Sequence, residues 1–188
     1  MLAVAGARHV HDGGDGVDTA ATIRGDTNEC PVLCSICGGE CCRTKPGIDG
    51  PERVLATPDP AEALFLLINS GFWVLDQHYG THPAGEAVDD GDERPIHYPR
   101  PATLVEREEM SFLAIPGPGE CVFLGVEGCL LPFAERPRMC RALEPEVNFE
   151  CRTSWTRRDA ALVWLPSQEM VAAVLARLRS RCTEVAGT

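Results

Sequence analysis

Apolar residues recur at helical spacing in two segments of the chain. Residues 61–69 place Leu64, Leu67 and Ile68 on one face. Asp59 precedes this segment as an N-cap candidate, Pro60 occupies its first position, and Ser70-Gly71 ends it. A second stripe follows Pro166 near the C-terminus and consists of Met170, Val171, Val174, Leu175 and Leu178. Both patterns predict helices whose apolar faces lie in a core.

Shorter apolar runs predict strands. We expect a buried strand at 72–75, and another over Met110–Ile115 that ends at Pro116-Gly117. Residues 121–124 and 129–131 flank Gly125-Val126-Glu127-Gly128, a pattern typical of a β-hairpin with Cys121 and Cys129 on either side of its turn.

The remaining segments are less regular. Residues 153–165 predict a third amphipathic helix, and residues 135–141 a compact basic turn. Residues 81–101 contain four prolines and an acidic run, which predicts a loop or an insertion. Glu106, Glu108 and Glu109 form a charge run that we expect to be exposed.

The chain therefore divides into three parts. Residues 8–29 are rich in Gly, Asp and Thr without an apolar period, so we predict a disordered N-terminal arm over residues 1–29. Residues 30–182 form the predicted cysteine-cluster metal-binding domain, and 183–188 a tail. We expect an α+β fold: a small, irregular, metal-stapled single domain of short helices with a β-hairpin.

Charge and composition exclude some classes of function. The 188 residues include 28 acidic and 17 basic side chains, for a net charge of −11, which disfavours nucleic acid as a partner. The chain has no run of 18 apolar residues that would suggest a membrane span. The apolar start, residues 1–7, is short and has no basic residue before it, unlike a secretory signal. We predict a cytoplasmic protein without a membrane partner, in which thiols stay reduced.

Cysteine density is the strongest chemical signal in the chain. The segment Cys34-Ser35-Ile36-Cys37-Gly38-Gly39-Glu40-Cys41-Cys42 holds four of the ten cysteines within nine residues. Disulfides are the alternative use of so many thiols, but clustered cysteines in a reducing compartment favour metal. Neighbouring cysteines also bridge each other only with strain. We expect a short helical turn here that loosens into a loop at Gly38-Gly39, whose amides approach the sulfurs.

Two metal chemistries fit these spacings. Cys34-x2-Cys37 matches a zinc knuckle, and the same run continued to Cys41 resembles a loop that binds an iron–sulfur cluster. We predict zinc or iron as the cofactor, with a 4Fe-4S cluster as one form of the latter. Eight cysteines could form one site or two. The predicted ligands are Cys34, Cys37, Cys41, Cys42, Cys121, Cys129, Cys140 and Cys151.

The order of these motifs resembles a known family. The CxxCxxxCC run, Cys121-Val122-Phe123-Leu124, Gly128-Cys129, residues 136–141 and Cys151 after Leu143-Glu144-Pro145 are similar to those of the YkgJ-type cysteine-cluster proteins, described as zinc- or iron-chelating. The resemblance covers roughly residues 30 to 180. The segment 81–101 is longer than in the shortest members. Cys30 and Cys182 have no obvious counterpart, so we leave them out of the site.

The resemblance implies metal binding more firmly than it implies an activity. One class of function is a metal-binding protein with a structural, sensing or metal-handling role, which binds a metal ion or cluster and could also have a protein partner. The alternative is an iron–sulfur enzyme, because the family includes a flagellin lysine methylase that carries such a centre. The sequence identifies no catalytic residue.

The surroundings of the cysteines suggest how metal would be held. Arginines flank several of them, namely Arg43, Arg138, Arg141 and Arg152. They are either donors to thiolates around a metal or ordinary surface residues. His78, His82 and His97 are further ligand candidates, each more typical of a surface residue. As a hypothesis, the two cysteine segments meet in space, and bound metal contributes to folding because neither segment has a core of its own.

Overall fold

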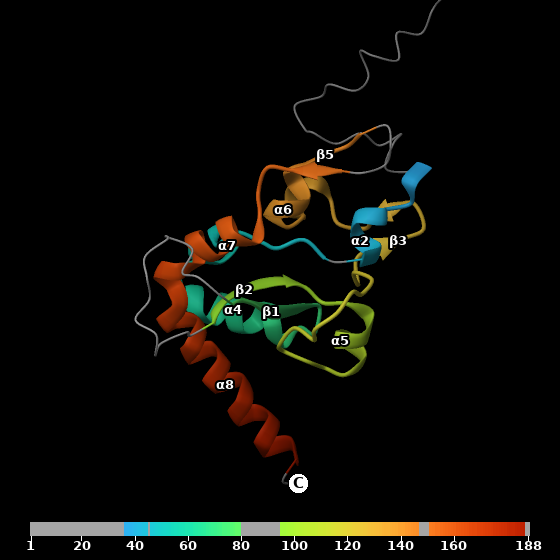
Figure 1. Cartoon of the computed structure of the whole chain (residues 1–188). Coiled ribbons are helices and arrows are strands. Elements are labelled where there is room, and N and C mark those ends of the chain that lie inside the picture. Colours follow the sequence, from blue (N-terminus) through green and yellow to red (C-terminus); the bar gives the residue numbers. More distant parts are fainter. Residues whose placement is uncertain (1–35, 45, 80–94, 147–150, 187–188) are drawn as a thin grey trace, which may run out of the picture.

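The computed structural model describes residues 36–44, 46–79, 95–146 and 151–186. These form a small α+β domain of short helices and antiparallel strand pairs (Figure 1). The predicted N-terminal arm, 1–29, lies outside the described residues. The elements are α2 Glu40–Thr44, α3 Glu52–Leu55, α4 Pro60–Asn69, β1 Trp73–His78, β2 Ile96–Pro101, α5 Leu104–Glu108, β3 Leu124–Gly125, β4 Gly128–Cys129, η2 Phe133–Glu135, α6 Arg138–Arg141, β5 Leu143–Glu144, β6 Arg152–Thr153, α7 Arg157–Trp164, η3 Leu165–Ser167 and α8 Gln168–Ala186.

Helix α4 begins and ends as its sequence predicts. The side chain of Asp59 accepts a hydrogen bond from the backbone N–H of Glu62, and Pro60 occupies the first turn. Gly71 follows the end of the helix at φ +74°, a left-handed conformation that glycine adopts without steric cost. Leu64, Phe65 and Ile68 are buried on the inner face.

The prediction of a loop over 81–101 is wrong at its C-terminal end. Residues 96–101 form β2, which pairs antiparallel with β1, with Leu75 opposite Pro99 and Trp73 opposite Pro101. The prolines are tolerated because β2 belongs to a sheet of only two strands and needs few ladder hydrogen bonds on its outer side. On that side the carbonyl of Pro99 accepts a bond from the N–H of Asp49 at 3.0 Å.

The hydrophobic core is built without cysteine side chains. Buried apolar residues from α4, β1, β2, α7 and α8 pack together, and Leu64, Leu75, Tyr98 and Trp164 have no measurable exposure. The indole N–H of Trp164 donates to the carbonyl of Asp49 at 2.9 Å. The predicted metal stapling stays a prediction, and it concerns the segments that carry the thiols.

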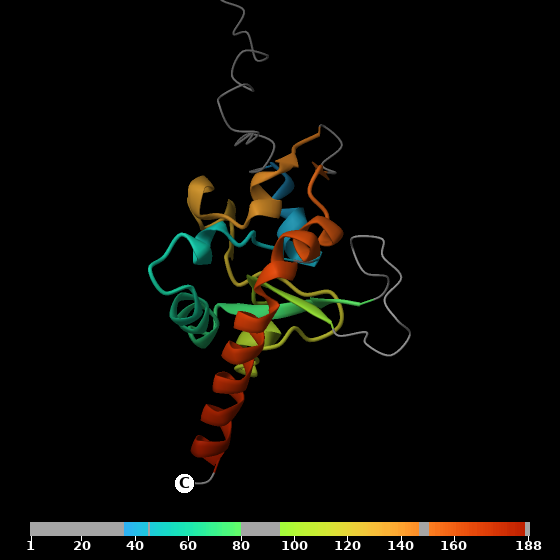
Figure 2. The ribbon, with the colours of Figure 1, turned by 90° about the vertical axis from the view of Figure 1, so that its left-hand side faces the viewer.

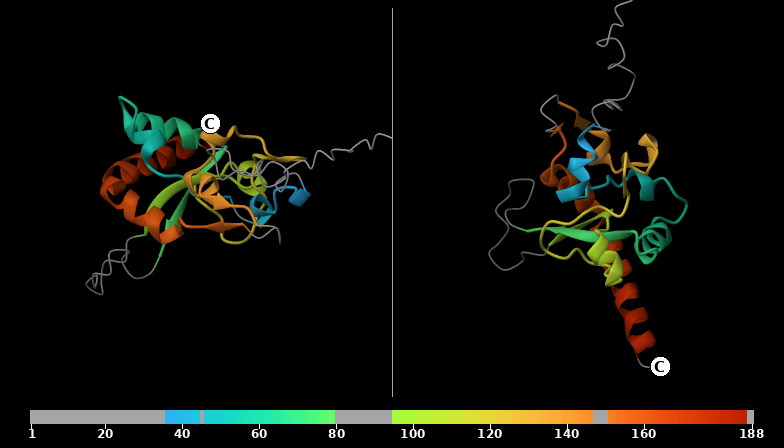
Figure 3. Two further views of the ribbon diagram at one scale, coloured as in Figure 1. Left: turned by 90° about the horizontal axis from the view of Figure 1, so that it is seen from above. Right: turned by 90° about the vertical axis from the view of Figure 1, so that its right-hand side faces the viewer.

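Helix α8 packs one face against the domain and continues beyond it (Figures 2 and 3). The predicted stripe is confirmed, because Val171, Val174, Leu175 and Leu178 are buried, while α8 packs on α4. The helix runs to Ala186 and so includes most of the residues assigned to a tail. By length and composition alone, the helical stretch Arg157–Arg181 could cross a membrane, a criterion that the core helix of a soluble protein also meets.

Two local predictions between β2 and the hairpin fail. Residues 110–115 make only an isolated bridge, between Leu113 and Leu75, because Met110 has φ +51° and the Ser111 hydroxyl bonds the backbone of Leu113.

The hairpin exists as β3 and β4, but Cys121 lies three residues before β3 and instead bridges to Thr103. Only Cys129 belongs to the ladder, opposite Leu124.

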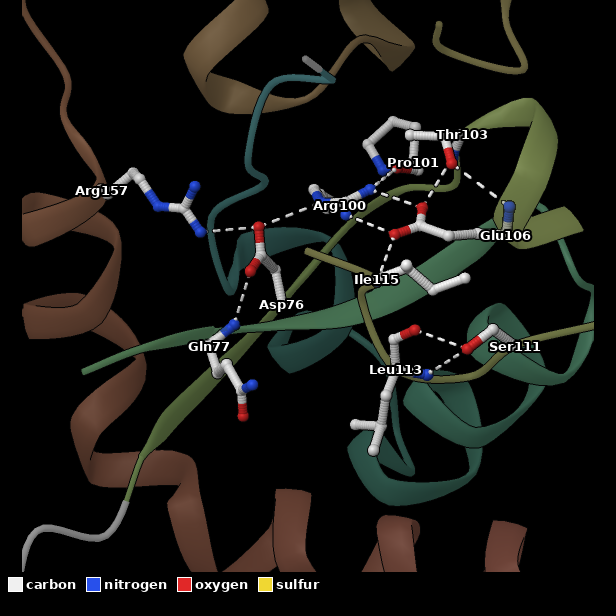
Figure 4. A network of polar contacts seen from close by, with 10 residues as sticks. All are labelled: Asp76, Gln77, Arg100, Pro101, Thr103, Glu106, Ser111, Leu113, Ile115 and Arg157. Carbon is white, nitrogen blue, oxygen red and sulfur yellow. Dashed lines mark hydrogen bonds and ion pairs between the residues drawn. The ribbon is translucent and has the colours of Figure 1, made fainter. Parts of the chain in front are cut away.

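A buried ion-pair network lies beneath this region (Figure 4). Both terminal nitrogens of Arg100 bond the carboxylate of Glu106, at 2.8 and 2.6 Å, and its Nε bonds Asp76 at 2.9 Å. Arg157 donates to the same Asp76 oxygen at 2.7 Å. The expectation that Glu106 is exposed is wrong, since it is fully buried on α5 and also accepts from the N–H groups of Thr103 and Ile115.

Candidate metal centre

Two glycines shape the segment that carries the clustered cysteines. The helical turn at Ile36–Cys37 stops at Gly38 and Gly39, which have φ +61° and +77°, and helix α2 then begins at Glu40. The predicted loosening at these glycines is thus confirmed, although the helix resumes after them. A Cβ on Gly39 would lie 2.5 Å from Leu124, so only glycine lets α2 approach the β3–β4 hairpin this closely.

Backbone pairing holds the first cysteine segment against the second (Figure 1). The N–H of Cys121 donates to the carbonyl of Cys42 at 2.8 Å, and the N–H of Gly119 donates to the carbonyl of Thr44 at 3.0 Å. The next residue along, Val122, bonds the carbonyl of Ala102 at the end of β2. The hypothesis that the two cysteine segments meet is therefore confirmed.

Four thiols converge at this junction. The sulfurs of Cys41 and Cys42 are 4.0 Å apart. Hydrogen bonds to Cys121, Cys129 and Cys41, in that order of strength, raise the pKa of Cys42 far above its usual range. Cys42 and Cys121 are buried, Cys129 is half-buried and Cys41 is exposed. A single thiol at the centre, Cys42, thus connects the other three.

The neighbours of Cys42 are the more acidic members of this group. The hydrogen bond with Cys42 lowers the pKa of Cys41 to about 7, and the amides of Cys41 and Cys42 assist it. The same central thiol lowers the pKa of Cys121, with help from the amide of Phe123 and the charge of Arg100. The amides that act on these two sulfurs are those of Cys41, Cys42 and Phe123, and a contribution from Gly38 and Gly39 stays a prediction.

Cys140 lies beside this group in a tight enclosure. A Cβ on Gly47 would lie 2.5 Å from the Cys140 sulfur, so the chain passes directly over the thiol. Burial raises the pKa of Cys140 to about 12, and negative charge on Cys121 and Cys41 adds to this effect. The charges of Cys121, Cys41 and Cys129 thus reach the Cys140 thiol, and burial keeps it protonated.

The structure thus brings together four of the eight predicted ligands, with Cys140 next to them. Cys37 and Cys151 are half-buried, and Cys34 lies outside the described residues, as does Cys30. In the described part of the chain, no group of three or more His, Cys, Asp or Glu side chains is arranged so that it could hold a metal ion. The thiols would have to lose their protons and close on an ion to bind it.

The flanking arginines mostly have carboxylate partners. Arg138 bonds Glu52 at 2.5 Å and Arg152 bonds Glu146 at 2.7 Å, while Arg43 lies 3.6 Å from Glu40. Arg141 differs from them, because its Nε is buried without a hydrogen-bond partner among the described residues. Among the four flanking arginines, Arg141 thus has a buried N–H donor that could still bond a partner, and it is adjacent in sequence to Cys140.

Two residues that act on the cysteines were missed in the sequence. The described histidines, proposed as further ligands, show no contact with the cysteines. Gly47 lies far in sequence from Cys140, and Arg100 lies far from Cys121, so no local signal marks these relations. The side-chain amide of Gln168 accepts a hydrogen bond from the N–H of His97 and donates one to its carbonyl. Burial, together with the charge of Arg179, lowers the pKa of the His97 side chain. His78 ends β1, and His82 lies outside the described residues.

The pKa difference between Cys41 and Cys140 predicts their reactivity. In metal-free, reduced protein near pH 7, we expect iodoacetamide to modify Cys41 at least ~10-fold faster than Cys140, because the thiolate is the nucleophile. Cys41 has a pKa of about 7 and is exposed, whereas Cys140 has a pKa of about 12 and is less accessible. Both differences make Cys41 the faster-reacting thiol. Peptide mass spectrometry over time measures both rates. Equal rates would show that the two thiols share one environment.

Comparison with protein-family models, with curated proteins and with solved structures finds no match to this chain. The resemblance to the YkgJ-type proteins therefore stays a prediction from the motifs. Any function assigned to the chain depends on the geometry of its thiols.

Proposed function

We propose that this chain is a metal-binding protein and that Cys41, Cys42, Cys121 and Cys129 hold a zinc ion. The observation that carries the proposal is the convergence of an adjacent cysteine pair with two cysteines from a distant part of the chain. Four soft thiolate donors at one point are the ligand set of a structural zinc site.

The spacing of the sulfurs supports zinc. In a tetrahedral site with Zn–S bonds of about 2.3 Å, neighbouring sulfurs lie about 3.8 Å apart. The Cys41 and Cys42 sulfurs are separated by 4.0 Å. Small side-chain rotations would suffice to bring them to that distance, since both residues already lie on α2.

The charge balance of the site also supports the proposal. Four thiolates and Zn²⁺ sum to −2, and burial makes such a charge costly unless donors or cations offset it. The amide of Phe123 and the charge of Arg100 already act on Cys121. These two groups would stabilise the Cys121 thiolate over its thiol, which favours metal over a proton at that ligand.

Metal analysis tests the proposal directly. We expect protein purified without oxygen and without added chelator to be colourless and to contain one zinc per chain. Removal of zinc should free the thiols of Cys41 and Cys42 for titration with a disulfide reagent. Folded protein that binds no metal, even when zinc is supplied under reducing conditions, would contradict the proposal.

The iron–sulfur alternative has its own signature in the same experiment. A brown preparation with absorbance near ~400 nm and stoichiometric iron indicates a cluster held by thiolates. That result would replace zinc by iron in the proposal and make the enzymatic alternative, related to protein-modifying family members, the one to pursue.

A further inference from the structure

The four converging thiols differ sharply in their access to solvent. Cys42 and Cys121 have 7% and 4% of their surface exposed, whereas Cys41 is exposed and Cys129 is half-buried. A metal bound by all four would therefore have two inner ligands and an outer side. Structural zinc sites enclosed by protein have no such open side.

Backbone hydrogen bonds hold the main chain of the two inner cysteines together. The N–H of Cys121 bonds the carbonyl of Cys42, and the flanking bonds Gly119 to Thr44 and Val122 to Ala102 extend this pairing to the end of β2. These bonds keep both inner residues in the buried junction. Cys41 lies on α2 one residue from Cys42, and its side chain is exposed.

From this asymmetry we propose that the bound zinc is exchangeable cargo and that it enters and leaves through Cys41, by ligand exchange with an external thiol. The inference rests on the proposed zinc site, and it identifies Cys41 as the ligand at which zinc exchange begins. Cys42 and Cys121 hold the ion while Cys41 gives up its bond first.

The exchange step is balanced in atoms and charge. An external thiol approaches the exposed side, its sulfur forms a bond to zinc, and the bond from zinc to the Cys41 sulfur breaks. The proton of the incoming thiol passes to the released Cys41 sulfur. The incoming sulfur would bind before the Cys41 sulfur departs, so Cys42, Cys121 and Cys129 would keep holding the ion during this step. No change of oxidation state is involved.

The segments that carry the thiols also carry exposed apolar side chains. Ile36, Val126 and Leu130 have 63%, 97% and 68% of their surface in solvent. Leu124 and Gly128 approach Gly39 closely, which places the hairpin directly against the glycine turn that precedes Cys41. The donor class that the site requires is a thiol, whichever molecule carries it.

The test follows zinc and each cysteine in the same sample. Full-length protein loaded with one equivalent of zinc is treated with limiting N-ethylmaleimide, and zinc release is recorded with the dye 4-(2-pyridylazo)resorcinol. Peptide mass spectrometry measures modification of each cysteine over time. We expect Cys41 to be modified at least ~10-fold faster than Cys42 and Cys121, and zinc release to follow the modification of Cys41.

Glutathione supplies the second measurement. Transfer of zinc to the dye should accelerate in proportion to glutathione concentration in the wild-type protein and in the control Cys182→Ser. In Cys41→Ser, which already lacks the outer ligand, zinc should leave at least ~10-fold faster without glutathione. A Cys41→Ser protein that keeps the wild-type rate would show that this residue does not control exit.

The outcomes separate the two proposals. A protein that takes up no zinc contradicts the site and the exchange together. Stoichiometric zinc whose release is independent of glutathione, with all four thiols modified at one rate, retains the site and contradicts the exchange. In that case zinc would escape only when the whole junction opens.

Discussion

Replacing Glu106 by glutamine is expected to destabilise the domain by about 3–5 kcal/mol, the cost of breaking a buried ion pair by removing one partner. The substitution keeps the size of the side chain but leaves Arg100 with one charged partner, Asp76, which it shares with Arg157. The new amide group would also face the N–H donors of Thr103 or Ile115.

Thermal and denaturant unfolding measure this effect. For a chain of this length, the loss corresponds to a fall in Tm of roughly 6–20 °C. The matched control is Glu108→Gln on the same helix, where the side chain is exposed, and its effect should stay within about 0.5 kcal/mol. Equal, small effects for the two variants would mean that the Glu106 pair adds no stability beyond a surface glutamate.

The same carboxylate predicts an acid limit to stability. Burial raises the pKa of Glu106, but the hydrogen bonds and charge of Arg100 and the backbone donors outweigh it, and the pKa lies below its ordinary value. The stabilisation is therefore complete above the unfolded-state pKa of about 4.3 and is lost as pH falls through the lower folded-state value. The stability difference between wild type and Glu106→Gln should shrink over that acid range.

Replacing Cys121 by serine is expected to abolish stoichiometric zinc binding while leaving the domain folded. Loss of an inner ligand should weaken zinc affinity more than about 100-fold, since changes to outer-shell partners alone cost about 10–100-fold. The core should persist because most of its buried apolar residues come from α4, β1, β2, α7 and α8, and the described part of this cluster contains no cysteine. Competition with a chelator measures affinity, and circular dichroism measures folding.

The controls for this variant separate ligation from folding. Cys182→Ser, outside the predicted site, should bind zinc as the wild type does. If Cys121→Ser unfolds while Glu108→Gln and Cys182→Ser remain folded, zinc or the Cys121 thiol stabilises more than its own segment, and the metal-stapled interpretation of the domain gains support.

Predictions from local pattern succeeded where neighbours in sequence carry the signal. The cap at Asp59, Pro60 in the first turn and the stop at Gly71 all operate within a few residues, and the structure reproduces them. The stripe of α8 is equally local, because its period follows from helix geometry alone. The hairpin at 124–129 follows from its turn residues.

The predictions that failed depended on contacts that the apolar pattern does not encode. Pro99 and Pro101 suggested a loop, but pairing with β1 makes their segment a strand. Glu106 looked like part of an exposed acidic run, but Arg100, outside that run, is its buried partner. Residues 110–115 looked like a strand, but the positive φ of Met110 interrupts it and leaves one bridge to Leu75.

The sequence by itself determined the chemical inventory: ten cysteines, an excess of acidic side chains and the local signals that start and stop the helices. Only the tertiary structure decided which thiols meet, because their meeting depends on backbone pairing between residues 42–44 and 119–121. It also decided that Cys42 lies at the centre and Cys41 at the surface. Adjacent residues on a short helix point in different directions, and what covers each one is a property of the rest of the fold.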